Sequence, residues 1–192
     1  KDLEAADIIF GVKEVPIDDL LPEKTYFFFS HTIKKQPYNR DLLRKVLALN
    51  IKLIDYECLT DSEGGRILGF GRYAGVVGTY NALLTYGKRT EKYDLKPAYK
   101  CKDRNEMEAE LAKVRLPENF KIAITGLGRV ASGATEIFDE LGIQKIEADE
   151  FLDQEVSQAS YTQLTVRDYF KKADGSDFTR EEAYAHAERF ES

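Results

Sequence analysis

The feature that most constrains the fold is a glycine-rich turn between a predicted strand and a predicted helix. The apolar run at residues 121–125 predicts a strand, and residues 131–141 have helical spacing. Between them the chain contains the pattern Gly126-x-Gly128-x-x-Ala131. In that context Gly126 permits a tight turn, Gly128 lets the backbone approach a pyrophosphate, and Ala131 allows close packing of the helix. The pattern predicts the opening of a Rossmann nucleotide-binding domain.

The turn predicts a dinucleotide as cofactor, for which NAD and NADP are the candidates. The residues expected to contact it are Gly126, Gly128, Arg129, Val130 and Ala131. An acidic ribose ligand is expected about 20 residues after the turn, near Glu147 and Asp149. Arg129 suits the 2′-phosphate of NADP, whereas Glu147 would oppose it, so the sequence leaves the choice open. A glycine-rich turn in an unrelated α/β protein is the alternative interpretation.

The first half of the chain has the strand–helix–strand pattern of a parallel sheet. Residues 7–12, 25–30 and 51–56 predict strands, and residues 39–49 predict a helix with Asn39 as its N-cap. Short links between these elements imply parallel pairing through a right-handed crossover. The expected fold class is therefore α/β, with a parallel-sheet catalytic domain followed by the first part of a Rossmann nucleotide-binding domain.

The chain is expected to hold two domains. Residues 66–70 predict a further strand and residues 74–86 a helix, whose small residues would allow close packing against another backbone. Residues 88–104 are polar and aperiodic, so they are interpreted as an interdomain connection. We therefore expect a catalytic domain at 1–115 and the start of an NAD(P)-binding domain at 116–192.

The chain is also expected to be a fragment. Its only methionine is Met107, and residues 151–192 are charged and lack a strand pattern, with a helix expected at 179–189. Such a tail cannot supply the second half of a dinucleotide domain, which needs two βαβαβ halves. We therefore expect the isolated chain to be inactive. Exposed apolar faces such as residues 27–29 are expected either to leave it marginally stable or to make it associate as a homo-oligomer.

Composition excludes several classes of partner. With 28 Lys and Arg against 34 Asp and Glu, the chain carries a net charge of −6, which disfavours nucleic acid and anionic membranes. It contains no apolar run long enough to cross a bilayer. Cys58 and Cys101 lack paired spacing, which favours a cytoplasmic protein with free thiols and no metal site. Small-molecule substrates are the expected partners.

Polar side chains follow three of the predicted strands. Lys13 and Glu14 come after the first strand, His31 after the second and Glu57 after the third. Ligands bind at the carboxyl ends of parallel strands, where such groups supply proton donors and acceptors. His31 is one of only two histidines and is the natural group to titrate near neutral pH. Taken singly, each of these residues is more often an ordinary surface charge.

Arg72 is a candidate substrate-binding residue. It stands in the segment FGRYAG, residues 70–75, where Gly71 brings the backbone near a ligand at a helix entry. A guanidinium at that position suits a substrate carboxylate. A glycine-relaxed surface turn is an equally good interpretation of the same residues.

Several of these segments together resemble one enzyme superfamily. Residues 11–16, GVKEVP, look like the lysine-bearing loop of the alanine dehydrogenase and lysine-forming saccharopine dehydrogenase superfamily. The segments FFSHTIK (28–34), LIDYE (53–57) and FGRYAG are most similar to the lysine–ketoglutarate reductase domain of bifunctional aminoadipic semialdehyde synthases. The resemblance covers nearly the whole chain, and the segment around His31 is its most specific part.

The resemblance implies roles for individual residues. Lys13 and His31 map onto the acid–base pair of the superfamily, and Lys34 maps onto a second lysine three residues after the histidine. The glutamates that match Glu14 and Glu57 lie near the substrate and tune the pair. The glycine-rich turn maps onto the nicotinamide dinucleotide site.

The resemblance also implies a function, the NAD(P)-dependent joining of lysine and 2-oxoglutarate to saccharopine, or the reverse. An alanine dehydrogenase, which takes ammonia and pyruvate, is the nearest alternative, and a carboxylate placed for a second amino group would favour lysine. A non-catalytic nucleotide-sensing module and a proton-translocating transhydrogenase subunit are further alternatives. The presence of both Lys13 and His31 argues against these last two.

Overall fold

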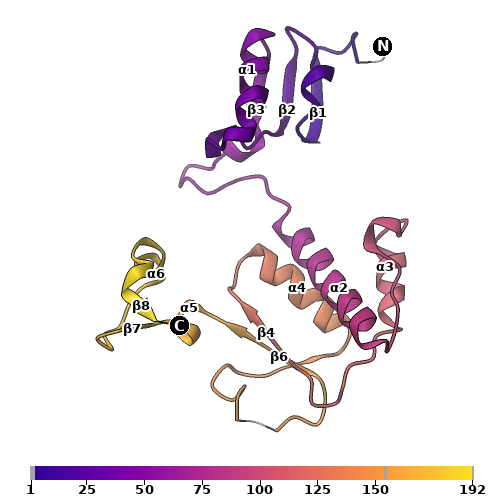
Figure 1. Cartoon of the computed structure of the whole chain (residues 1–192), viewed down its shortest axis with the longest axis vertical. Coiled ribbons are helices and arrows are strands. Elements are labelled where there is room, and N and C mark those ends of the chain that lie inside the picture. Colours follow the sequence, from indigo (N-terminus) through magenta and orange to yellow (C-terminus); the bar gives the residue numbers. More distant parts are fainter. Residues whose placement is uncertain (1–2, 154, 192) are drawn as a thin grey trace. The chain divides into compact units, whose positions relative to one another are not determined.

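The computed structural model describes residues 3–153 and 155–191 of the chain. The chain forms two compact units, residues 1–69 and residues 70–192 (Figure 1). Each unit contains a parallel β-sheet with a helix packed against it, which confirms the α/β class. The boundary between the units comes well before the division expected after residue 115.

The first unit holds three parallel strands in the order β1-β2-β3. They span Ile8–Lys13, Thr25–Phe29 and Lys52–Asp55, close to the predicted ranges. The crossover between β2 and β3 contains helix α1, Arg40–Ala48, as the strand–helix–strand pattern predicts. Short 3₁₀ turns lie at Ile17–Asp19 (η1), Thr32–Lys34 (η2), Pro37–Asn39 (η3) and Tyr56–Cys58 (η4).

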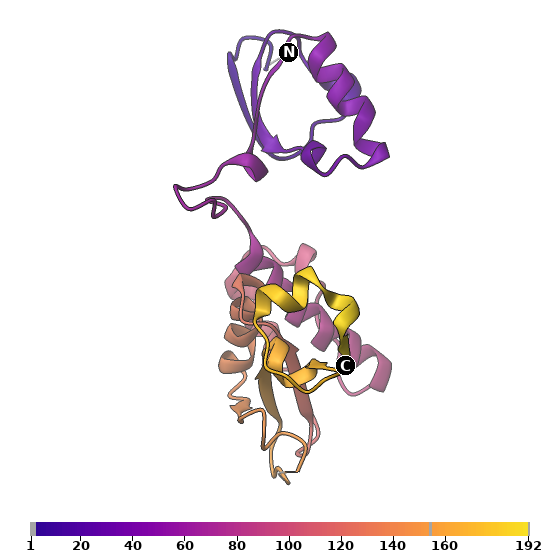
Figure 2. The same ribbon diagram turned by 90° about the vertical axis from the view of Figure 1, so that its left-hand side faces the viewer.

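One face of this sheet is buried under α1. Tyr26 and Phe28 alternate to the same side of β2 and pack with Leu42 of the helix. Figure 2 shows α1 running alongside the sheet. On the other side, the ring of Phe10 stacks on that of Phe27 with centroids 4.6 Å apart, yet Phe10 is 69% exposed. The described residues thus cover one face and leave the other exposed along β1, whereas parallel sheets are ordinarily covered on both.

The second unit contains the glycine-rich turn and the helices around it. Strand β4, Lys121–Thr125, leads through the turn into helix α4, Arg129–Glu140, as predicted. Helix α2, Gly71–Thr90, packs along α4, and helix α3, Arg104–Leu111, contributes to the same core. A 3₁₀ turn, Ala98–Lys100 (η5), lies between α2 and α3 in the chain.

The strand expected at residues 66–70 does not form in the described chain. Arg66 makes only an isolated antiparallel bridge with Thr60, and α2 begins directly after the segment. The turn between Thr60 and Arg66 is closed by the Asp61 amide, which donates to the Gly65 carbonyl at 2.8 Å. A two-stranded pairing this short has no further strand to stabilise it.

Glycines allow α2 and α4 to pack at backbone contact. A Cβ atom at Gly75 would lie 1.9 Å from the Val130 carbonyl oxygen, and one at Gly133 would lie 1.8 Å from the Arg72 carbonyl oxygen. Both distances are far below any non-bonded contact, so neither position accepts a larger residue unless a helix moves. This confirms the expectation that small residues in this helix pack against another backbone.

The segment expected to connect two domains instead packs onto α2. Leu95 is 1% exposed within the core of the second unit. The Tyr93 hydroxyl donates to the Leu83 carbonyl at 2.9 Å, and the Tyr80 hydroxyl donates to the Lys96 carbonyl at 2.5 Å. The few apolar and aromatic residues of this polar stretch are thus anchored to the helix. For that reason the compact units do not part near residue 115.

The sheet of the second unit contains a strand that the sequence pattern does not indicate. Strand β6, Ser160–Leu164, pairs in parallel with β4 and with the short β5, Gln144–Lys145, which gives the order β4-β6-β5. The expectation that residues 151–192 have no strand was therefore wrong. The buried positions of β6 include Ser160 and Thr162, whose hydroxyls have no hydrogen-bond partner among the described residues. Because these positions are polar, the strand lacks the usual apolar alternation.

The remainder of the tail forms a small cluster around Phe178, which is buried with Val166 and Ala183. The helix expected at 179–189 is shorter in the structure and is followed by a 3₁₀ turn. The elements of this cluster are α5 (Val166–Tyr169), β7 (Lys171–Lys172), α6 (Arg180–Ala185), η6 (Ala187–Arg189) and β8 (Phe190–Glu191).

Candidate active site

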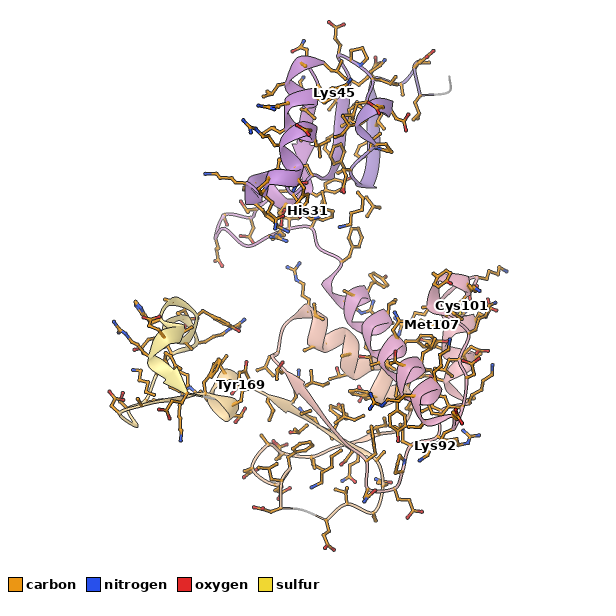
Figure 3. The ribbon with its side chains drawn as sticks, viewed as in Figure 1. His31, Lys45, Lys92, Cys101, Met107 and Tyr169 are labelled. Atoms are coloured by element: carbon orange, nitrogen blue, oxygen red, sulfur yellow. The ribbon has the colours of Figure 1, made fainter. Side chains whose placement is uncertain are left out.

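His31 lies just beyond the carboxyl end of β2, at one end of the first sheet (Figure 3). Its backbone has a φ of 56°, a left-handed conformation in which histidine is enriched. The Asn39 side-chain amide donates to the His31 carbonyl at 3.3 Å. Asn39 thus occupies the N-cap position of α1 without capping it, because its side chain holds the histidine backbone instead.

Both ring nitrogens of His31 have charged partners. Nδ1 lies 3.0 Å from a carboxylate oxygen of Glu57, and Nε2 lies 3.2 Å from the ammonium nitrogen of Lys13. Nδ1 also lies 3.2 Å from the ammonium nitrogen of Lys34. An ionised carboxylate only accepts hydrogen bonds, so in the tautomer with its proton on Nδ1 that proton is donated to Glu57. Nε2 then accepts from the Lys13 ammonium. The arrangement places one exchangeable proton between a lysine and a histidine.

Glu57 is the buried centre of this cluster. Its side chain is 4% exposed, and one carboxylate oxygen lies 3.3 Å from Lys34 Nζ and 3.1 Å from Arg66 Nη2. Burial alone would raise the pKa of Glu57. Hydrogen bonds from His31 and Lys34, together with the charges of Lys34 and Arg66, outweigh burial and lower that pKa below its usual value. Glu57 therefore remains ionised at neutral pH and holds the imidazole ring.

A buried pair beneath the cluster positions the two loops that carry it. The Ser30 hydroxyl donates to the Asp55 carboxylate in a short hydrogen bond, and Asp55 accepts the Glu57 backbone amide at 2.8 Å. Ser30 is fully buried, and its hydroxyl oxygen accepts the Thr32 amide at 3.1 Å. These bonds tie the end of β2 to the end of β3 and fix the loops after both strands.

Sequence reasoning missed Ser30, Asp55 and Arg66. Ser30 and Asp55 fall at the ends of predicted strands, where a polar residue in an apolar run was the available signal. Arg66 was assigned to a strand, and it reaches Glu57 only because the chain reverses between Thr60 and Arg66. No pattern of neighbouring residues in the sequence predicts such a chain reversal.

The lowered pKa of Glu57 predicts how the stability of the chain depends on pH. The ionised form is stabilised in the folded state, so its contribution is fully present above the unfolded-state value of 4.5 and is lost as the pH falls through the lower folded-state value. Glu57→Gln should therefore flatten the loss of stability on the acid side. The measurement is the free energy of unfolding in urea over the range of about pH 3 to 7.

A matched variant separates this effect from that of other carboxylates. Glu63→Gln removes an exposed carboxylate from the nearby turn and should leave the acid-side slope as it is in the parent chain. If Glu57→Gln also keeps the parent slope, then the cluster does not stabilise the charge of Glu57.

Two expected substrate contacts, Glu14 and Arg72, have other surroundings. Glu14 is exposed just after β1 and makes no hydrogen bond or ion pair with any other residue that the structure describes. Arg72 belongs to the second unit, where its guanidinium donates to both carboxylate oxygens of Glu136 at 2.5 and 2.8 Å. That ion pair joins α2 to α4. The roles of Glu14 and Arg72 toward a substrate stay predictions.

The glycine-rich turn has the shape that a close approach to its backbone requires. Gly126 has a φ of 92°, a conformation that favours glycine, and its amide donates to the carbonyl at the end of β6 at 2.7 Å. A Cβ atom at Gly126 or Gly128 would meet open space, whereas Ala131 is buried. Arg129 and Val130 form the first turn of α4. The cofactor contacts expected of these five residues stay predictions.

The acidic residues expected to bind the ribose lie further from the turn than predicted. Glu147 and Asp149 follow β5, and β6 stands between β5 and β4. Because neighbouring strands are about 4.8 Å apart, β5 lies roughly 10 Å from β4. The loop adjacent to the glycine-rich turn is therefore the one after β6.

The cluster around His31 lies in a part of the chain that a known family matches. Residues 1–77 match the family model described as alanine dehydrogenase/PNT, N-terminal domain. This part of the chain is therefore similar to that family. The matched range includes Lys13, His31, Lys34 and Glu57, so the whole cluster lies within it.

Individual relatives extend the similarity beyond the alanine dehydrogenase/PNT domain. The chain is 37% identical to the mitochondrial alpha-aminoadipic semialdehyde synthase of Bos taurus, over 82% of this chain and 19% of that protein. It is 30% identical to the saccharopine dehydrogenase (NAD(+), L-lysine-forming) of Candida glabrata, over 85% of this chain and 47% of that protein. These similarities confirm the resemblance noted from the sequence. The chain spans about a fifth of the first relative and about half of the second.

A solved structure and the helices add two further observations. An L-alanine dehydrogenase superposes on 88% of this chain and 45% of its own, with a TM-score of 0.48 and 12% sequence identity. None of the helices that the structure describes is long and apolar enough to cross a membrane. The relative in Bos taurus is named as mitochondrial, and a cytoplasmic location for this chain stays a prediction.

Proposed function

We propose that the cluster in the alanine dehydrogenase/PNT domain is the acid–base centre of an NAD(P)-dependent oxidoreductase that joins lysine to 2-oxoglutarate. The observation that carries the proposal is the continuous path from Lys13 Nζ, through both ring nitrogens of His31, to the buried carboxylate of Glu57. Relatives named as lysine-forming saccharopine dehydrogenases support the substrate class.

The reaction needs one group that both accepts and returns a proton. The substrate ammonium must lose a proton before its nitrogen attacks the oxo carbon, and the hydroxyl of the carbinolamine must gain a proton before it leaves as water. The Lys13–His31 pair can perform both steps, because an unprotonated nitrogen of the pair can accept the proton and its partner, 3.2 Å away, can hold it and return it. The proton taken from the ammonium leaves in the water, so the pair ends in its starting state. The nicotinamide cofactor, when bound, supplies the hydride that reduces the imine.

The charges around Glu57 suit this exchange. When His31 accepts a proton, the ionised carboxylate at 3.0 Å stabilises the imidazolium. Lys34 and Arg66 share the same carboxylate, so His31 is not its only partner.

The glycine-rich turn fits a dinucleotide. Gly126 and Gly128 leave open space above the backbone. The first amides of α4 have no partner within the helix and favour a negatively charged group. This donor set suits a pyrophosphate, as in other dinucleotide-binding turns.

Glu14 favours lysine over ammonia as the amine. It follows Lys13 directly, is exposed and makes no ion pair with any described residue. A free carboxylate beside the acid–base pair can bind the second amino group of lysine, whereas ammonia has none.

A substrate panel on the full-length protein tests the proposal. Turnover, followed by the absorbance of NADH or NADPH, is expected only when lysine and 2-oxoglutarate are both present. Turnover with ammonia and pyruvate instead would make the protein an alanine dehydrogenase. Nucleotide binding without turnover of either pair would favour a sensing module. The isolated chain, which covers about a fifth of its relative in Bos taurus, is expected to be inactive.

A further inference from the structure

Asn39 is a buried polar side chain that lies outside the path from Lys13 to Glu57. It is 8% exposed and ends the η3 turn, directly before the first residue of α1. An asparagine at the start of a helix ordinarily accepts a backbone amide of the first turn through its side-chain oxygen. Asn39 makes no such bond, and its own backbone, with φ −88° and ψ −2°, is not in the extended conformation of an N-cap.

The Asn39 amide is directed at the backbone of His31 instead. Its nitrogen lies 3.3 Å from the His31 carbonyl oxygen, which also accepts the Lys34 backbone amide at 3.1 Å. A carbonyl oxygen only accepts hydrogen bonds, so the NH2 group is the end of the amide that faces it. Two donors thus occupy one carbonyl, and together they fix the direction in which it points.

The backbone of His31 is in a conformation that a residue with a Cβ atom does not readily keep. Its φ of 56° and ψ of 9° are left-handed. Such a conformation persists only where the surrounding structure determines it. The Thr32 amide, next in the chain, donates to Ser30 Oγ at 3.1 Å. The turn that presents the imidazole is therefore held by two side chains, those of Ser30 and Asn39.

The imidazole depends on this turn for its contacts. Nδ1 lies 3.0 Å from Glu57 and Nε2 lies 3.2 Å from Lys13. Lys13 belongs to β1 and Glu57 follows β3, so neither partner moves with the turn after β2. A rotation of the His31 backbone would therefore change both distances. A misplacement of roughly 1 Å in a reacting group can cost about 10²-fold in rate.

We propose that Asn39 is a positioning residue for catalysis, whose amide holds the His31 carbonyl and thereby keeps the imidazole between Lys13 and Glu57. The inference rests on the proposed acid–base centre and adds to it a residue that acts only through His31. Asn39 gives up the capping bond that its position offers. That pattern is expected where a functional site, rather than the helix, determines the residue.

The test is Asn39→Asp in the full-length protein. Aspartate has the shape of asparagine, and its carboxylate cannot donate to a carbonyl. Turnover of lysine and 2-oxoglutarate should fall by roughly 10- to 100-fold, the scale for a misplaced reacting group. The KM values should change little, because no substrate contact is removed. Asn39→Ala, which removes the amide without adding a charge, should give a similar loss.

A double variant and a matched control separate positioning from other effects. In a protein that already carries His31→Asn, Asn39→Asp should cause no further loss of turnover, because the group on which Asn39 acts is gone. Asn105→Asp makes the same change at an exposed position in the first turn of α3 and should leave turnover at the parent value.

The histidine ring can also be observed without turnover. Nitrogen-15 NMR of the 192-residue chain reports the tautomer and protonation of its two histidines, His31 and His186. In the Asn39→Ala chain the ring signals of His31 should shift, and those of His186 should keep their parent positions. This comparison does not depend on which substrates the protein uses.

Each outcome decides the inference. Parent turnover in both Asn39 variants, or an equal further loss in the His31→Asn protein, would overturn it. Loss of the parent circular dichroism spectrum in both variants would assign Asn39 to the fold and would overturn it as well. If lysine and 2-oxoglutarate do not turn over at all, the proposed reaction fails. The NMR comparison then decides, and unchanged His31 signals would reject the positioning role.

Discussion

Replacing His31 by asparagine in the full-length protein is expected to lower the turnover of lysine and 2-oxoglutarate by roughly 10²–10⁴-fold, the usual loss when a general acid or base is removed. Asparagine is the sharpest replacement because it tolerates the left-handed backbone at a φ of 56°. The loop after β2 should therefore keep its shape while the imidazole is lost. Steady-state kinetics with the reduced cofactor provide the measurement.

Two further measurements test whether the loss of turnover is specific to His31. Cofactor affinity should change little, because the substitution leaves the glycine-rich turn unaltered. His186→Asn alters the second histidine, which lies in the tail 3.5 Å from Glu188, and should leave turnover at the parent value. Parent-level turnover in the His31→Asn protein would assign His31 to structure alone.

Replacing Gly75 by alanine is expected to destabilise the second unit by roughly 3 kcal/mol, the upper part of the range for overpacking a core. The new methyl group would lie 1.9 Å from the Val130 carbonyl oxygen, and its other near neighbours are also backbone atoms of α4. Side-chain rotation cannot relieve contacts with backbone atoms. Only a separation of α2 from α4 can do so, and it would expose the apolar core between the helices. Urea unfolding followed by circular dichroism measures the loss.

Gly78 supplies the matched control for this prediction. It lies on the same helix, one turn further on, and a Cβ atom there would meet nothing within 4 Å. Gly78→Ala should raise stability by about 0.5–1 kcal/mol, because alanine loses less backbone entropy in a helix. If the two alanine variants have equal stability, close packing of α2 on α4 is not what stabilises the unit.

The cluster around His31 was largely accessible to sequence reasoning. Lys13, His31 and Glu57 each follow a strand that the apolar pattern locates, and parallel strands bring their carboxyl ends to one edge. What the pattern could not supply was the support for these residues. Ser30 and Asp55 meet through pairing between strands, and Arg66 arrives through a chain reversal. Such contacts depend on tertiary geometry rather than on spacing in the chain.

In the second unit, less of the structure could be predicted from the sequence. The turn at Gly126 was located because glycine spacing is a local signal. Strand β6, the neighbour of β4, was not predicted, because its buried positions include the polar residues Ser160 and Thr162. The stretch around Leu95 was interpreted as an interdomain connection because most of its residues are polar. A single buried leucine and two tyrosine hydroxyls are enough to anchor it to α2. Periodicity detects elements that are apolar along a whole face and overlooks those anchored at a few points.

The position of β6 between β4 and β5 has a consequence for how this unit acquires its structure. Lys121 pairs with Ser160 although α4 and β5 both lie between them in the chain. During synthesis β4, α4 and β5 leave the ribosome first, and in the described chain neither of the two earlier strands has any partner but β6. The sheet therefore depends on a non-local pairing, which slows folding relative to local contacts. Until Leu164 has emerged, β4 and β5 lack their pairing strand, and the nascent unit exposes strand edges that favour aggregation.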